Sequence, residues 1–352
     1  MEPVEPMSEE NLFGCELPII QAPMAGSDGS ALAIAVSNAG GLGSIGCATL
    51  APDTIGKTLT TIAGATSGPY NVNFFCHQQP TPDPARERAW LDLLAPYFAE
   101  FGIDPSTIAT GPGRAAFNAE AADVLERFKP PIVSFHFGVP PDALVARVKS
   151  WGSKVIASAT TVDEARYLEA HGVDAVIAQG SEAGGHRGMF LTTDLATQIP
   201  TLTLVQQIVD AVSVPVIAAG GIADASDVAE VLAVGAIAAQ VGTAYLFCPE
   251  ATTNPLHRAT LKSEAARTTA VTNLLTGRPA RGIVNRLMRE VGPINAAAPE
   301  FPLATSAIMA LRAKAEPKGI NDFTSMWAGT NARGCREMAA ADLTRQLAAG
   351  VA

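Results

Sequence analysis

The chain has 352 residues, of which 48% are hydrophobic and only 16% are charged, and its formal net charge is −10. This composition excludes a disordered chain, which needs low hydrophobicity and high charge, and a coiled coil, which needs many charged helix formers. The apolar stretches contain Gly, Pro or Ser and are shorter than the roughly 20 residues of a membrane span, so we expect no membrane partner. Nucleic acid is not expected either, because its phosphates attract basic surfaces.

The sequence favours a cytoplasmic protein without a metal. Residues 1–10 are acidic and lack the basic-then-apolar pattern of a signal peptide. Five cysteines are dispersed without a Cys-x-x-Cys pair, which favours a reducing compartment over a disulfide framework or a zinc site.

Strand and helix patterns alternate along the first 250 residues. Eight segments have the apolar character of strands that are buried on both faces: 17–23, 41–46, 70–75, 131–137, 154–159, 174–180, 214–220 and 236–242. Helical patterns lie between them, with one extra helix: 29–39, 51–64, 84–101, 115–128, 141–151, 161–171, 201–211 and 225–234. Helix starts are marked by Thr161 and Asp224, and helix ends by Gly172 and Gly235.

This eightfold alternation predicts an α/β fold of the (β/α)8 TIM barrel type. A doubly wound open sheet is the alternative, but its first strand–helix turn would carry a G-x-G-x-x-G fingerprint. Residues 22–29 read APMAGSDG and do not fit that fingerprint. We therefore predict the barrel.

The character of the chain changes after the eighth predicted strand. Residues 251–290 are polar and rich in Arg, 292–305 are rich in Pro, and 335–350 have the pattern of a closing helix. We predict a barrel over 1–250, a smaller cap over 251–320 on the substrate side, and a C-terminal segment over 321–352 that returns to the barrel. The alternative is that the Arg-rich part is a solvated basic surface.

Active sites of such barrels lie in the loops that follow the strands. The loops after strands 7 and 8 contain Gly220 and Gly221, and then Gly242 and Thr243. Glycine loops that lead into a helix suit a phosphate, since backbone N–H groups approach it without interference from Cβ atoms. Both loops together predict a phosphate site.

Histidines and one amide could face a ligand at the same end. His186 lies in the glycine-dense loop 179–188. The backbone of this loop either lies against a flat ring or forms a flexible surface loop. His136 ends strand 4 and could face a ligand or be a core histidine, and Asn73 offers an amide to a heteroaromatic edge. Three further histidines are expected at the surface: His77, His171 and His257.

Five motifs closely resemble the nitronate monooxygenase family, formerly called 2-nitropropane dioxygenase: QAPMAG (21–26), NVNFF (71–75), QGSEAGGHRG (179–188), PVIAAGGI (215–222) and QVGTAYL (240–246). Residues 276–282 and 323–329 resemble the C-terminal part of that family. The resemblance implies a TIM barrel that binds FMN.

The resemblance also implies roles for individual residues. The flavin contacts would be Pro23, Met24, Asn73, Gln179, Gly184, Gly185, Gly220, Gly221, Gln240, Val241, Gly242 and Thr243. His186 matches the catalytic histidine of the family, and the substrate pocket would include His136 and Trp327. Thr330 departs from the family, which usually has Gln there, so the flavin contact of that side chain is open to question.

The implied reaction is oxidation of an alkyl nitronate, such as propionate 3-nitronate, by O2 to a carbonyl compound and nitrite. The partners would be this small substrate and O2, with a monomer or homodimer as the assembly. Two alternatives stay open: an FMN-dependent NAD(P)H reductase that acts on quinones or enoyl thioesters, and a flavin-binding protein without catalytic activity.

Overall fold

The computed structural model describes residues 12–108, 113–332 and 335–351; the acidic residues 1–11 discussed above lie outside them. Eight parallel strands form one sheet: β1 (Ile19–Gln21), β2 (Gly43–Gly46), β3 (Tyr70–Phe75), β4 (Ile132–His136), β5 (Lys154–Ala159), β6 (Ala175–Gln179), β8 (Val216–Ala219) and β9 (Ala238–Val241). The two ends of the sheet meet because the Leu42 N–H donates to the Ile19 carbonyl at 2.9 Å. The sheet is therefore a closed barrel.

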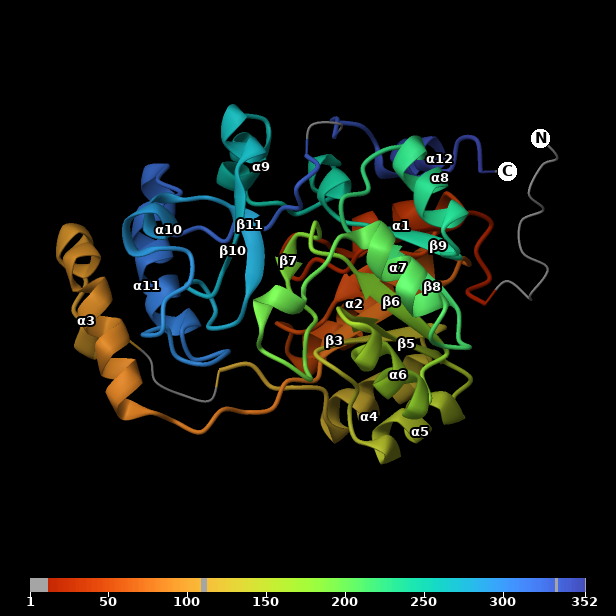
Figure 1. The fold of residues 1–352 in the computed structure, drawn as a ribbon, viewed down its shortest axis with the longest axis horizontal. Coiled ribbons are helices and arrows are strands. Elements are labelled where there is room, and N and C mark those ends of the chain that lie inside the picture. The colour runs from red at the N-terminus through yellow and green to blue at the C-terminus, as the bar shows by residue number, and fades with distance from the viewer. Residues whose placement is uncertain (1–11, 109–112, 333–334, 352) are drawn as a thin grey trace.

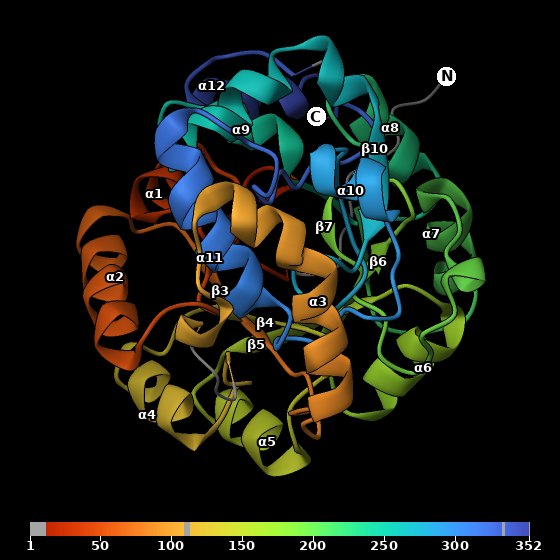
Figure 2. The same cartoon turned by 90° about the vertical axis from the view of Figure 1, so that its left-hand side faces the viewer.

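Helices surround the barrel (Figures 1 and 2). They are α1 (Ser30–Asn38), α2 (Pro52–Ala65), α4 (Ala119–Phe128), α5 (Asp142–Ser150), α6 (Val162–Ala170), α7 (Thr201–Val209), α8 (Ala225–Ala233) and α12 (Ala340–Leu347). The predicted (β/α)8 TIM barrel is confirmed. Local signals set its helix ends: Asp224 caps α8 in a capping box with Asp227, and Gly235 has the positive φ of 100° expected after a helix.

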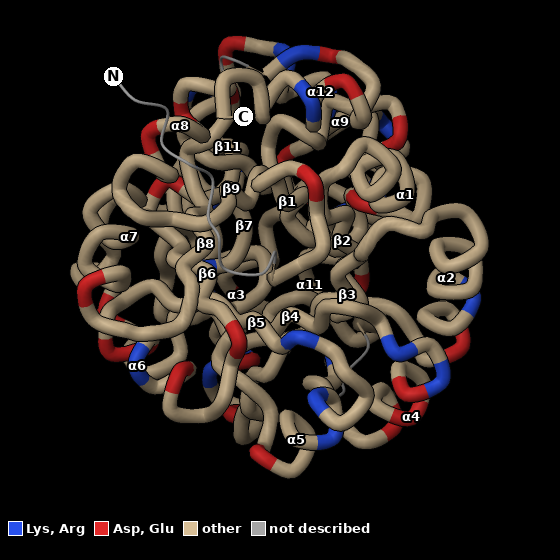
Figure 3. Tube along the Cα trace, turned by 90° about the vertical axis from the view of Figure 1, so that its right-hand side faces the viewer, with Lys and Arg blue, Asp and Glu red and all other residues tan. Residues whose placement is uncertain are grey.

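The low charge of the chain follows from this architecture. Lys154 is the single charged residue in the eight barrel strands. Figure 3 shows that charged residues lie mainly around the outer helices and their connections, while the central strands are almost free of them. Strands enclosed by helices on the outside and by side chains on the inside account for the apolar composition. Among the described helices, none is long and apolar enough to cross a membrane.

A second group of elements lies beyond one end of the barrel (Figures 1 and 2). It contains α3 (Pro84–Phe101), α9 (Pro255–Leu261), α10 (Arg286–Val291), α11 (Thr305–Ala315) and a three-stranded sheet of β10 (Thr269–Thr272), β11 (Ala280–Ile283) and β7 (Gly185–His186). A separate apolar cluster joins α3 to α10 and α11, including Trp90, Phe98, Leu287 and Leu311. The extra helix α3 thus packs with elements that follow in the chain some 200 residues later. The division at 250 and 320 stays a prediction.

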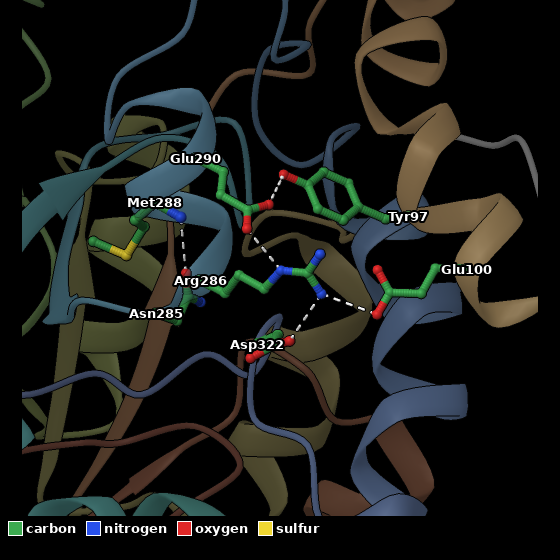
Figure 4. A network of polar contacts seen from close by, with 7 residues as sticks. All are labelled: Tyr97, Glu100, Asn285, Arg286, Met288, Glu290 and Asp322. Atoms are coloured by element: carbon green, nitrogen blue, oxygen red, sulfur yellow. Dashed lines mark hydrogen bonds and ion pairs between the residues drawn. The ribbon is translucent and has the colours of Figure 1, made fainter.

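One arginine fixes the relative orientation of these helices (Figure 4). The Arg286 guanidinium on α10 donates to Glu100 on α3 at 2.9 Å, to Asp322 at 3.3 Å and to Glu290 at 2.8 Å. The Tyr97 hydroxyl of α3 donates to Glu290 at 2.7 Å. This part of the Arg-rich segment is thus an ion-paired junction between elements rather than a freely solvated surface.

Candidate active site

A cavity of about 590 Å³ opens at the C-terminal ends of the barrel strands, a size typical of cofactor and small-molecule sites. The structure brings nearly all of the predicted site residues to its wall: Pro23, Met24, Asn73, His136, Gln179, Gly184, Gly185, His186, Gly220, Gly221, Gln240, Gly242, Thr243 and Trp327. Val241 is the exception. Its side chain is buried in the hydrophobic core of the barrel, and only its backbone faces the β1 loop, where its carbonyl accepts from Ala22.

One end of the cavity has a backbone that only glycine adopts without strain. Gly220 and Gly221 follow β8 with φ values of 125° and 74°. A Cβ atom on Gly220 would lie 2.7 Å from Oγ1 of Thr201. Gly242 follows β9 next to this loop, and a Cβ there would make only ordinary contacts. The two loops leave an open cradle beside the N-terminus of α8, where an anion is favoured by the helix dipole.

The loop before His186 lies against the C-terminal segment. A Cβ on Gly184 would lie 2.5 Å from the backbone of both Ala328 and Gly329, so no larger residue fits there. Thr330 is exposed and donates its N–H to the Glu182 carbonyl. The next residue instead reaches the cradle: Asn331 Nδ2 donates to the Gly221 carbonyl at 2.9 Å.

Three amide side chains lie on the cavity wall with different degrees of hydrogen bonding. Asn73 Nδ2 donates to the carbonyl and hydroxyl of Ser134 at 3.2 and 2.9 Å. Gln179 uses both ends of its amide on the loop that carries His186. Gln240 Oε1 is buried and has no hydrogen-bond partner. A buried amide without a partner is costly unless a ligand satisfies it, so Gln240 marks a place for the polar edge of a ligand.

His186 occupies the centre of an aromatic box. Its Nε2 lies 2.9 Å from Oγ1 of Thr276, a residue between β10 and β11. Four aromatic rings surround the imidazole at centroid distances between 5.5 and 5.8 Å: Phe75, Phe137, Phe301 and Trp327. Two residues of β7 are enough to present this ring, because β7 pairs with β11 through His186 and Ala280.

Burial and positive neighbours keep His136 and His186 neutral near pH 7. Burial lowers the pKa of His186 well below its usual value, and the charges of Arg114, His136 and Arg278 lower it further. Burial also lowers the pKa of His136 to about 4. The ring of His136 pairs with the backbone carbonyl of His186 at 3.1 Å, so His136 supports the loop as well as lining the cavity.

The surface placement expected for two histidines is wrong. His77 and His257 are only 5% and 3% exposed. His77 Nε2 pairs with the Arg114 carbonyl at 3.1 Å, and His257 lines the cavity with an unpartnered Nε2. Both lie outside the barrel strands: His77 is two residues beyond β3 and packs edge-on against Phe301, and His257 lies on α9. His171 is half-buried and stacks on Tyr167.

The sequence reading missed several polar residues of the cavity wall. They come from the segment before α4 and from the second group of elements: Arg114, Asn254, Thr276, Thr305 and Arg312. None of them follows a barrel strand directly, so the strand–loop pattern carried no signal for them. Arg114 and Arg312 are half-buried cations of the wall, and the guanidinium of Arg312 is paired with Glu316 at 2.7 Å.

The electrostatic character of the cavity is opposite to that of the chain. Its described wall contains three histidines and two arginines but no Asp or Glu, although the net charge of the chain is −10. No cluster of His, Cys, Asp or Glu that could hold a metal ion occurs in the described part of the chain. The arrangement therefore suits an anionic organic ligand next to a neutral imidazole.

Known proteins share this sequence and fold over nearly the whole chain. The family model described as nitronate monooxygenase matches residues 7–350. The chain is 44% identical to the nitronate monooxygenase of Pseudomonas aeruginosa over 96% of both chains, and 42% identical to that of Paraburkholderia phytofirmans over 96% of this chain and 92% of the other.

Two solved structures show the same architecture. Nitroalkane oxidase from Streptomyces ansochromogenes superimposes with a TM-score of 0.86 at 38% identity and 96% coverage of both chains. FabK from Thermotoga maritima follows with a TM-score of 0.71 at 29% identity, covering 96% of this chain and 93% of the other. Together with the motifs that line the cavity, these matches show that the chain belongs to the nitronate monooxygenase family.

Proposed function

We propose that the protein is an FMN-dependent enzyme that oxidises alkyl nitronates with O2 to a carbonyl compound and nitrite. The family is flavin-dependent, and its named relatives are nitronate monooxygenases. The observation that carries the proposal for this chain is the cavity itself. An imidazole kept neutral by burial lies in an aromatic box, and the described wall holds cations but no carboxylate that would repel an anionic substrate.

The residues present fit FMN. Gly220, Gly221 and Gly242 would hold the phosphate in the cradle beside α8 through backbone N–H groups that no Cβ atom shields, and the Thr243 hydroxyl would add a hydrogen bond. Gln240, whose buried Oε1 has no partner, would hydrogen-bond a polar edge of the ring or the ribityl chain. Pro23, Met24, Gly184 and the amide of Asn73 complete the proposed wall. When bound, FMN would supply the redox chemistry, which no side chain here can provide.

His186 would act on the substrate proton. A neutral imidazole can accept the α-proton of a nitroalkane, or share a hydrogen bond with a nitronate that arrives already deprotonated. Arg114 would attract the anion, and a carboxylated nitronate such as propionate 3-nitronate would place its second negative charge near it. His136 and Trp327 would border the substrate.

Two further proposals concern the setting of the enzyme. The five cysteines form no disulfide in the described part of the chain, which supports the proposed cytoplasmic location. The monomer or homodimer stays a prediction.

The decisive experiment for the function is a product assay on the purified protein. Denaturation should release FMN from a yellow protein, and propionate 3-nitronate should be consumed together with O2 while nitrite accumulates. An FMN-loaded protein that releases no nitrite from any alkyl nitronate would overturn the proposal. Turnover of quinone or enoyl thioester with NAD(P)H would then support the reductase, and no turnover at all would support a non-catalytic flavin-binding protein.

A further inference from the structure

A buried polar network connects both ends of the segment that carries His186. Gln179, at the end of β6, donates from Nε2 to the His186 carbonyl at 3.0 Å and accepts from the Gly188 N–H at 2.7 Å. Phe190 and Leu191 follow His186 by four and five residues, and their N–H groups donate to Glu164 Oε1 at 2.6 and 3.2 Å. The backbone on the C-terminal side of His186 is therefore fixed by two side chains of the barrel.

Arg187 lies between the residues that Gln179 and Glu164 bind, and its side chain points into the protein interior. It is 1% exposed and is absent from the cavity wall, although its neighbour His186 faces the cavity. Its guanidinium donates to the Gln179 carbonyl and to Gln198 Oε1, each at 2.8 Å. Burial lowers its pKa to about 10, so the side chain still carries its charge at neutral pH.

The positive charge of Arg187 is stabilised by the charges of Glu182 and Glu164, and a chain of hydrogen bonds connects it to Glu164. Among the described residues, no carboxylate forms a salt bridge with it. Gln198 accepts from Arg187 and donates from Nε2 to Thr160 Oγ1 at 3.0 Å, and this hydroxyl donates to Glu164 Oε2 at 2.8 Å. Every donor points from the cation towards the carboxylate, so each bond polarises the next.

This arrangement of buried charges lowers the free energy of unfolding relative to an apolar core. Glu164 has no exposed surface, Arg187 Nη1 is buried without a partner, and buried charges without direct contact cost free energy that apolar residues would not. Both charges act on the same short stretch, residues 186–191. Costly polar groups that converge on one segment are expected where geometry must be fixed for function.

We propose that Arg187 and Glu164 are positioning residues for His186. They hold residues 186–191 between Gln179 and the N-terminus of α6, so that the imidazole keeps its place against Thr276 and the aromatic box. The inference rests on the proposed function, in which His186 contacts the substrate. A displacement of about 1 Å can reduce turnover by about a hundredfold without removing any reacting group.

The test compares Arg187→Met, Glu164→Gln and the double variant with Arg286→Met. Arg286 is also a partly buried, hydrogen-bonded arginine, but it joins α3 and α10 away from the cavity. We expect Arg187→Met and Glu164→Gln each to lower kcat by about 10- to 100-fold, with FMN affinity and KM for nitronate changed less than about threefold. Because both act through one segment, the double variant should lose about as much as one single variant. Arg286→Met should lower Tm but leave kcat nearly unchanged.

Hydrogen–deuterium exchange gives a reading that does not depend on turnover. Faster exchange in residues 185–191 is expected for Arg187→Met, whereas Arg286→Met should accelerate exchange only in α3 and α10. Full kcat in Arg187→Met below its Tm, or losses that multiply in the double variant, would overturn the positioning role. A wild-type protein without nitronate turnover would reject the proposed function instead, while the exchange data would still show whether the network holds the segment.

Discussion

His186 and Thr276 face each other across the cavity wall, with Nε2 of the imidazole 2.9 Å from Oγ1 of the hydroxyl. The hydroxyl in turn donates to the Arg278 carbonyl at 3.4 Å. When the hydroxyl donates its proton to this carbonyl, it accepts from His186, whose neutral ring then carries its proton on Nε2. Nδ1 is then the nitrogen that is free to accept a proton.

His186→Asn should retain FMN but lose turnover. The amide preserves a polar side chain of similar reach but cannot take a proton, and loss of a general base costs about 10²- to 10⁴-fold. The measurement is kcat for a neutral nitroalkane, alongside the FMN content of the variant. Turnover equal to wild type would reject the catalytic role.

Thr276→Val should lower the same kcat by about 3- to 10-fold, because loss of one hydrogen bond is worth about 0.5–1.5 kcal/mol and releases the imidazole from its fixed tautomer. Thr276→Ser keeps the hydroxyl and serves as the control, with turnover close to wild type. Turnover of Thr276→Val equal to that of wild type would contradict the role of the hydroxyl.

Arg114→Met should move the acid limb of the pH profile to higher pH. The pKa of His186 is lowered well below its usual value by burial first, and by Arg114 as the leading charge. Protonation below that pKa removes the base, so kcat/KM for a neutral nitroalkane should be level between pH 6 and 8 and fall only at lower pH. Without the charge of Arg114, the protonated form of His186 is easier to form, so the pKa of His186 rises. Arg114→Lys keeps the charge, and its limb should remain near that of wild type; an identical limb in all three proteins would contradict the electrostatic account.

Gly221→Val should weaken FMN binding. Gly221 has a φ of 74° and lines the proposed phosphate cradle, and a Cβ there would lie 3.2 Å from Cβ of Glu182, so a branched side chain strains the backbone and displaces the loop that forms the cradle. Gly319 has a similar φ of 77° at the end of α11, with no atom within 4 Å of its Cβ position. Gly319→Val should therefore show the loss of stability without the loss of FMN affinity. A fluorescence titration with FMN compares them, and equal affinities in the two variants would place the phosphate elsewhere.

The barrel could be predicted from sequence because its signals are local. Apolar strands, helix caps such as Asp224 and glycine turns such as Gly220–Gly221 each require only neighbouring residues. The cavity positions of Gly220, Gly221 and His186 could be predicted for the same reason, since they lie in loops that follow barrel strands. The two-residue strand β7 gives no periodic pattern, and its pairing with β11 depends on residues almost 100 positions away.

The rest of the cavity could not be predicted because distant packing builds it. Arg114 and Arg312 are brought to the cavity by segments that no strand pattern places, and His257 is buried by elements outside the barrel. Val241 shows that a motif can also place a side chain wrongly. A motif placed it at the flavin site, but the alternation of side chains along β9 directs it into the core.

Anaerobic mixing of the FMN-loaded protein tests the central claim most directly. An alkyl nitronate alone should bleach the flavin absorbance, and admission of O2 should restore it with release of nitrite, while NADH and NADPH should leave it almost unchanged over the same time. Rapid bleaching by NADH or NADPH, with no response to nitronate, would contradict the account and identify the protein as a reductase.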